Sequence, residues 1–60
     1  MILEIFDEKY MCELQGDSAK IYTDEGDAWL YWFTYCGGKL TKQNLTSAII
    51  RKNRGRDEND

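Results

Sequence analysis

The sequence predicts an α+β fold: a four-stranded antiparallel meander sheet followed by one C-terminal helix packed on one face. Two observations predict the sheet. Short stretches in the first half alternate apolar and polar residues, and glycine-centred turns separate the later stretches. The third observation is a narrow apolar stripe at helical spacing after Gly37-Gly38. Sixty residues are enough for one small domain, which we expect to span residues 1–56 ahead of a frayed acidic tail at 57–60.

A turn signal lies between each pair of expected strands, so the strands should follow one another as hairpins. Asp7-Glu8-Lys9 is the weakest signal, because it contains neither Gly nor Pro. Gln15-Gly16-Asp17-Ser18 and Asp24-Glu25-Gly26-Asp27 are stronger, because Gly supplies a positive φ and Asp and Ser bond to nearby backbone. The predicted strands are Met1–Phe6, Tyr10–Leu14, Ala19–Thr23 and Ala28–Cys36.

The fourth of these strands, Ala28–Cys36, contains both tryptophans of the chain and has no charge, Gly or Pro. Aromatic residues fit a pleated surface well. Strict alternation predicts one face with Trp29, Tyr31, Phe33 and Tyr35, and a second with Leu30, Trp32, Thr34 and Cys36. A strand that is apolar on both faces is usually covered on both sides. We therefore expect this strand at the centre of the sheet.

The helix is expected from about Thr41 to Asn53. Thr41 is a plausible N-cap, and Leu40 and Leu45 occupy the two positions of a hydrophobic staple. Gly55 is a natural residue just beyond the end of the helix. The stripe that should dock on the sheet consists of Leu45, Ala48 and Ile49.

One short helix covers only one face of a sheet, so the second apolar face of the aromatic strand requires another explanation. We expect a homodimer or a firmly bound partner protein with Trp29 or Trp32 in the contact, because Trp and Tyr are enriched in interface cores. The alternative is that sheet twist and long neighbouring side chains cover this face within one molecule.

Charge is distributed unevenly along the chain. Residues 1–27 carry eight acids and two lysines, a net charge of −6, and residues 28–38 carry no charge. Residues 39–56 then carry six basic residues and no acid, while the whole chain has a net charge of −3. An acidic sheet is thus followed by a basic helix. The two regions either neutralise each other within the molecule or serve a binding function.

Catalysis is not expected from this composition. The chain has no histidine for acid–base chemistry, and we find no serine motif with a base in reach. Two cysteines without histidine are too few for a closed zinc site, and Gly37-Gly38-Lys39 lacks the other residues of a phosphate-binding loop. We predict no enzyme activity, cofactor or metal.

The start of the chain, Met1 to Glu8, contains early acids and no basic segment, which is unlike a signal peptide. No apolar run approaches the length of a membrane span. We therefore expect a complete, cytoplasmic chain that does not contact membranes. Cys12 and Cys36 should then be reduced, although a disulfide between them remains the alternative.

The function that this pattern favours is a small, non-enzymatic inhibitor or adaptor that engages the basic surface of a partner protein. A basic surface in a cell is very often a nucleic-acid groove, so the extreme form is nucleic-acid mimicry of the kind seen in small acidic proteins of phages and mobile elements. This hypothesis rests on charge and size. The predicted partner-binding residues are Asp7, Glu8, Asp17, Asp24, Glu25, Asp27, Trp29 and Tyr31.

The alternative function is a small nucleic-acid-binding regulator that uses the basic helix on phosphates, with exposed aromatic residues stacking on bases. The residues of this alternative site are Lys39, Lys42, Arg51, Lys52, Arg54 and Arg56. The pI of about 4.8 disfavours it, because the electrostatic footprint of nucleic-acid binders is usually basic. Nucleic acid is therefore the less favoured partner.

Overall fold

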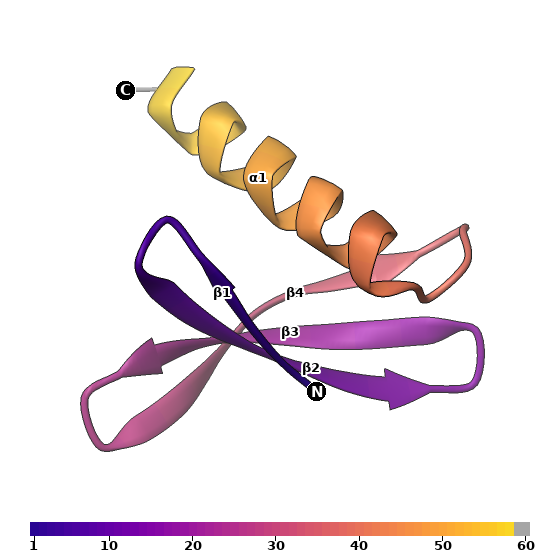
Figure 1. Ribbon diagram of the computed structural model, residues 1–60, viewed down its shortest axis with the longest axis horizontal. Helices are drawn as coiled ribbons and strands as arrows, with labels where there is room; N and C mark the ends of the chain where they lie inside the picture. Colours follow the sequence, from indigo (N-terminus) through magenta and orange to yellow (C-terminus); the bar gives the residue numbers. More distant parts are fainter. Residues whose placement is uncertain (59–60) are drawn as a thin grey trace.

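A computed structural model describes residues 1–58 of the chain, and the side chains of residues 1–54. Its four strands form one antiparallel sheet in the order β1-β2-β3-β4, and helix α1 follows (Figure 1). The predicted α+β meander with a C-terminal helix is therefore confirmed. The elements are β1 (Ile2–Ile5), β2 (Glu8–Gln15), β3 (Ser18–Glu25), β4 (Ala28–Cys36) and α1 (Lys42–Glu58).

All three hairpins close through two-residue turns, because Ile5 pairs with Glu8, Gln15 with Ser18 and Glu25 with Ala28. The second and third turns begin with Gly16 and Gly26, whose φ angles are 57° and 69°. The first turn consists of Phe6 and Asp7, and both of these residues also have positive φ. The sequence signal for this turn is weak because the turn contains no glycine.

β4 is an edge strand, paired only with β3, so the expectation that the aromatic strand is central was wrong. The expected strict alternation was also wrong. Ile21 pairs with Phe33 but Tyr22 pairs with Tyr31, which leaves Trp32 as the extra residue of a β-bulge. The bulge places Trp32 and Phe33 on the same side of the sheet, the side that α1 covers.

The start of α1 follows the prediction. The Asn44 amide donates to Thr41 Oγ1 over 3.1 Å, so Thr41 is the N-cap. The Asn44 side chain donates to the Lys39 carbonyl over 3.0 Å, which ties the connecting segment to the first turn. The end of α1 differs, since the helix continues through Gly55 to Glu58 instead of stopping near Asn53. The predicted tail at 57–60 lies partly outside the described residues.

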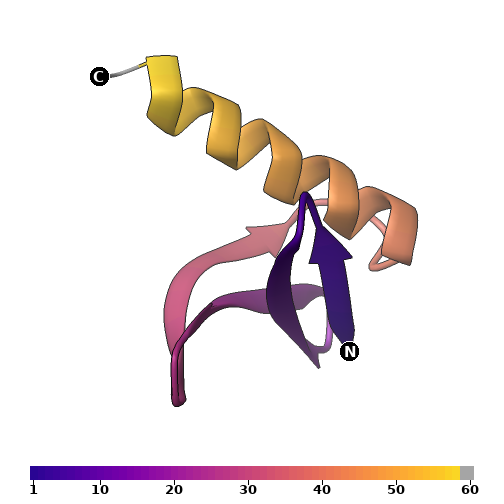
Figure 2. The same ribbon diagram turned by 60° about the vertical axis from the view of Figure 1, so that its left-hand side comes forward.

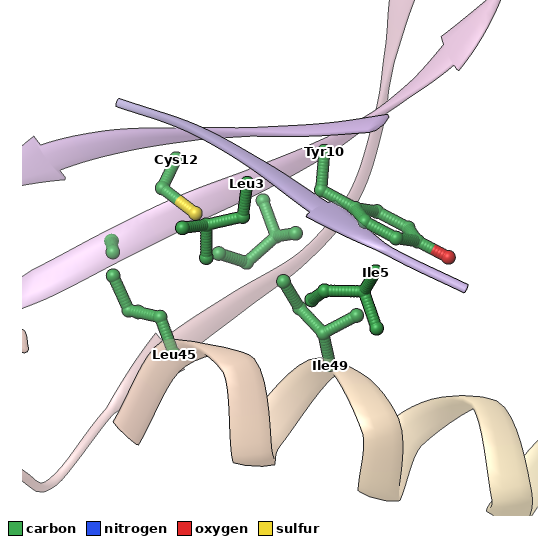
Figure 3. Close-up of a cluster of buried hydrophobic side chains, with 8 residues drawn as sticks. Leu3, Ile5, Tyr10, Cys12, Leu45 and Ile49 are labelled. Carbon is green, nitrogen blue, oxygen red and sulfur yellow. The ribbon is translucent and has the colours of Figure 1, made fainter. Parts of the chain in front are cut away.

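α1 crosses one face of the sheet, and no helix within residues 1–58 lies over the opposite face (Figures 1 and 2). The core lies between α1 and the sheet, where Leu45 and Ile49 point toward the side chains of β1 and β2 (Figure 3). Leu45, Ile49, Ala19 and Ile21 have no exposed surface. The full buried core is Leu3, Ile5, Tyr10, Cys12, Ala19, Ile21, Leu45 and Ile49.

Replacing Gly38 with Ala is expected to lower the free energy of unfolding by no more than about 1 kcal/mol, the low end of the overpacking cost in a core, because Gly38 is exposed and only the far end of the Tyr35 side chain must move. A Cβ atom at Gly38 would overlap the hydroxyl oxygen of Tyr35. Chemical denaturation followed by circular dichroism measures the change. Tyr35→Phe should restore most of the loss in the double variant, because it removes the overlapping atom. No restoration would mean that the loss has another cause.

Candidate functional site

Three aromatic side chains form a cluster on the helix side of the sheet. The rings of Tyr10 and Trp32 stack with their centroids 5.6 Å apart and their planes at 22°. Phe33 meets Trp32 edge-on at 5.0 Å. Tyr10 is buried, whereas Trp32 and Phe33 are only partly buried. This aromatic cluster therefore provides a rigid apolar surface that is partly open to solvent.

Two residues from the C-terminal half of α1 fix the cluster against the helix. The side-chain amide of Asn53 donates to the Tyr10 hydroxyl over 3.2 Å. The ammonium of Lys52 lies 5.5 Å from the centroid of the Phe33 ring, within the range of a cation–π contact. The position of Trp32, which stacks on Tyr10, is thus determined by the sheet and the helix together.

An open groove of about 840 Å³ lies beside this cluster, between the C-terminal half of α1, the β1–β2 turn and the β3–β4 hairpin. The β1–β2 turn lies close to α1, while the β3–β4 turn bends away from it (Figures 1 and 2). The lining residues are Phe6, Glu8, Tyr10, Thr23, Asp24, Glu25, Leu30, Tyr31, Trp32, Ile50, Asn53 and Arg54. We call this space the end groove.

Phe6 has an unusual conformation at the edge of the end groove. Its φ is 53°, in the left-handed region that bulky residues rarely adopt, and 74% of its surface is exposed. A conformation of this kind costs about 1–2 kcal/mol for a residue other than Gly, Asn or Asp. Burial in the core does not offset this cost, since Phe6 is largely solvated. Strain of this kind often occurs at functional sites.

The predicted partner-binding acids are divided between the two ends of the sheet. In a meander the first and third turns lie at the same end, which is visible for β1–β2 and β3–β4 in Figure 1. Asp7 and Asp27 lie in these two turns and are exposed. Asp17 lies in the β2–β3 turn at the other end. The residues of the predicted set that line the end groove are Glu8, Asp24, Glu25 and Tyr31.

The two tryptophans differ in position. Trp32 lines the end groove, whereas Trp29 is half-buried, pairs with Asp24 and is absent from the groove lining. A contact with a second molecule through either residue stays a prediction. Only Trp32 faces the helix side of the sheet.

The alternative basic site is spread along the helix. Lys39 and Lys42 lie at its N-terminal end, and Arg51, Lys52 and Arg54 begin more than two turns later. Lys52 is engaged with Phe33, and Arg54 lines the end groove beside its acids. The side chain of Arg56 lies outside the described residues. Nucleic-acid binding by this set stays a prediction.

Sequence reasoning missed several residues of the groove, namely Phe6, Tyr10, Thr23, Leu30, Ile50 and Asn53. Trp32 was expected in a contact with a second molecule, but not beside the acidic residues of this groove. One available signal was the meander itself, which brings alternate turns to the same end. A second was an aromatic residue, Phe6, next to the acidic turn. The placement of Trp32 could not be found in this way, because it depends on the bulge.

The two cysteines are free and lie on opposite faces of the sheet. Cys12 is buried on the helix side, while Cys36 is exposed and pairs with Ser18, whose neighbour Ala19 faces the core. A disulfide between them would have to pass through the sheet. Burial raises the pKa of the Cys12 thiol, and the nearby N-terminal ammonium opposes this effect.

Iodoacetamide is therefore expected to alkylate Cys36 in the folded protein and to reach Cys12 only after unfolding. Native Cys12 keeps its proton at alkaline pH values where the unfolded chain releases it, so stability should fall as pH rises through the thiol range. Mass spectrometry of the alkylated peptides measures both sites, and Cys36→Ser is the control. Equal labelling of both cysteines in the native state would contradict the buried position of Cys12.

Among the described residues, no three His, Cys, Asp or Glu side chains gather as a metal ion requires. No helix within residues 1–58 has the length and apolar character that crossing a membrane requires. Comparison of the chain with family models, with curated proteins and with solved structures finds no match.

Proposed function

We propose that the chain is a non-enzymatic binding protein, an inhibitor or adaptor that engages a basic surface of a partner protein through the end groove. One observation carries the proposal: exposed and half-buried apolar residues line the same groove as three acidic residues, Glu8, Asp24 and Glu25. A basic protein segment has both kinds of group that this groove could bind, namely apolar stems and positive charges.

Arginine and lysine combine an aliphatic stem with a charged head, so they bury the stem on apolar surface and keep the head near solvent or acids. In the end groove the stem would lie over Leu30 and Trp32 and the head would reach Glu8 or Glu25. A guanidinium also stacks favourably on a tryptophan ring. Among the residues whose side chains are described, Arg54 is the one basic residue of the groove lining, and it opposes this attraction.

Inhibition is proposed because basic side chains, which the end groove would bind, are the ones that nucleic-acid-binding proteins use to hold phosphates. Proteins that bind nucleic acid carry clustered basic side chains and often aromatic ones. A protein that occupies such a surface with carboxylates blocks access for phosphates. The exposed acids Asp7 and Asp27 in the neighbouring turns would add long-range attraction and speed up encounter.

The proposal is tested with an amphipathic model peptide of Arg, Leu and Ala, titrated against the Trp29→Phe variant. Trp32, the remaining tryptophan, then reports binding by its fluorescence. The double variant Glu8→Gln with Glu25→Gln is expected to bind about tenfold more weakly, mainly through slower and less salt-dependent association. Arg54→Gln should bind more tightly, since it removes a like charge.

The matched control is Glu13→Gln with Asp17→Asn, which changes the net charge equally but lies outside the groove lining. It should weaken binding much less. Equal weakening would show that only net charge matters and would overturn the groove as the site. A parallel titration with duplex DNA decides between the two functions: DNA binding that requires Arg51, Lys52 and Arg54 but tolerates the acidic changes would favour the nucleic-acid-binding alternative.

A further inference from the structure

The face of the sheet opposite α1 carries one apolar row across all four strands. Successive pairing joins Ile2 to Met11, Met11 to Tyr22, and Tyr22 to Tyr31. Ile2, Met11 and Tyr22 point away from the core, because their chain neighbours Leu3, Cys12 and Ile21 are buried against the helix. Tyr31 shares their face, since its ring meets that of Tyr22 edge-on with the centroids 6.0 Å apart. Ile2 and Tyr31 are 56% and 57% exposed. We call these four residues the outer row.

Charges of opposite sign flank the outer row on each central strand. On β2, Lys9 and Glu13 lie two residues before and after Met11. On β3, Lys20 and Asp24 lie two residues before and after Tyr22. Since β-strand residues two apart share a face, all four charges point outward with the row.

The charge of this face differs from that of the rest of the sheet. Residues 1–27 contain only two basic residues, Lys9 and Lys20, and both lie here. Glu13 pairs directly with Lys20, and Glu4 with Lys9. A nearly balanced face does not attract a basic partner or a phosphate backbone strongly, and it does not repel a second acidic copy of the chain.

We infer that the outer face binds a second copy of this chain in a symmetric, face-to-face dimer. A two-fold axis parallel to the strands places β2 over the partner's β3, so that Lys9 meets the partner's Asp24 and Glu13 meets the partner's Lys20. A two-fold axis along the outer row places each strand over its own copy, so that Lys9 meets the partner's Glu13. Opposite charges therefore meet in both arrangements, and apolar residues meet in the middle.

The size of the face sets the expected affinity. The four strands have 4, 8, 8 and 9 residues. At about 3.4 Å per residue and about 4.8 Å between strands, they present roughly 470 Å². A stable interface buries about 800 Å² per partner, so the dimer should form at micromolar rather than nanomolar concentration. The outer face shares only Asp24 and Tyr31 with the lining of the end groove. This inference is therefore tested separately from the proposed groove function, with substitutions at Met11, Glu13 and Leu14, which lie outside that lining.

Sedimentation equilibrium from micromolar to millimolar protein tests the dimer. The wild-type chain should shift from monomer to dimer over this range. Met11→Lys and Glu13→Lys should each raise the dissociation constant about tenfold or more, because both place a charge against an apolar or like-charged surface. The matched control is Leu14→Lys, which is also exposed but lies on the other side of β2 by alternation. It should dimerise as the wild type does.

A wild-type chain that stays monomeric at millimolar concentration overturns the inference. If the dimer survives both Met11→Lys and Glu13→Lys, the interface lies elsewhere and the inference is overturned. The same holds if Leu14→Lys weakens the dimer as much as these two variants do. Circular dichroism of each variant shows that it is folded. Should Met11→Lys unfold, Glu13→Lys decides alone, since Glu13 is already exposed and charged.

Discussion

Replacing Ile49 with Ala is expected to lower the free energy of unfolding by about 3 kcal/mol, within the usual range of about 2–5 kcal/mol for a buried Ile. Ile49 has no exposed surface and lies against β1 from the middle of α1 (Figure 3). A core in a domain of this size rarely supplies more than about 3–5 kcal/mol of net stability. A large fraction of the variant should therefore be unfolded at room temperature.

Urea denaturation followed by far-ultraviolet circular dichroism measures this loss. The matched control is Ser47→Ala, which introduces the same residue in the same helix at an exposed position. Its stability should change by less than about 0.5 kcal/mol. Ile49→Val should fall between the two. If Ile49→Ala unfolds like the control, α1 does not contribute to the core through this residue.

The elements that could be predicted are those in which local chemistry and tertiary structure agree. Thr41 caps α1 because its side chain is suited to an amide two or three residues ahead, whatever the helix then packs against. Gly16 and Gly26 form turns for an equally local reason. Alternation in β2 and β3 survives because one face of each strand is buried.

The elements that could not be predicted depend on contacts between distant residues. Trp32 turns toward the helix side because a bulge breaks the alternation, and the bulge is stabilised by stacking on Tyr10 from another strand. Gly55 does not end α1, although the local preference of glycine for the position just after a helix favours an end there. The aromatic strand lies at the edge because strand order follows the chain, and composition alone does not specify that order.

The candidate site was predictable in its charges and in one aromatic residue, Tyr31. Glu8, Asp24 and Glu25 belong to the set that sequence reasoning named, because acidic turns are visible in the sequence. Their common location depends on topology, and their apolar neighbours depend on the bulge and on α1. Asp17 was grouped with them although it lies at the opposite end of the sheet.

Replacing Phe6 with Asn is expected to make the protein more stable and to weaken the proposed binding to a basic partner. Asn accepts a positive φ far more readily than Phe, so relief of the turn should raise the free energy of unfolding by about 1 kcal/mol. Little burial is lost, since 74% of the Phe6 surface is exposed. The same change removes an aromatic side chain from the lining of the end groove, and the basic model peptide should bind about tenfold more weakly.

The control is Phe6→Leu, which keeps an apolar side chain at the groove and keeps the strained turn. It should leave stability near that of the wild type and retain most of the peptide binding. Urea denaturation and the Trp32 fluorescence titration measure the two quantities separately. A Phe6→Asn variant that is less stable than the wild type would show that Phe6 contributes packing that outweighs its strain. A variant that is more stable but binds the peptide with unchanged affinity would show that Phe6 takes no part in binding. Binding at the end groove would then not explain the strained φ of this turn.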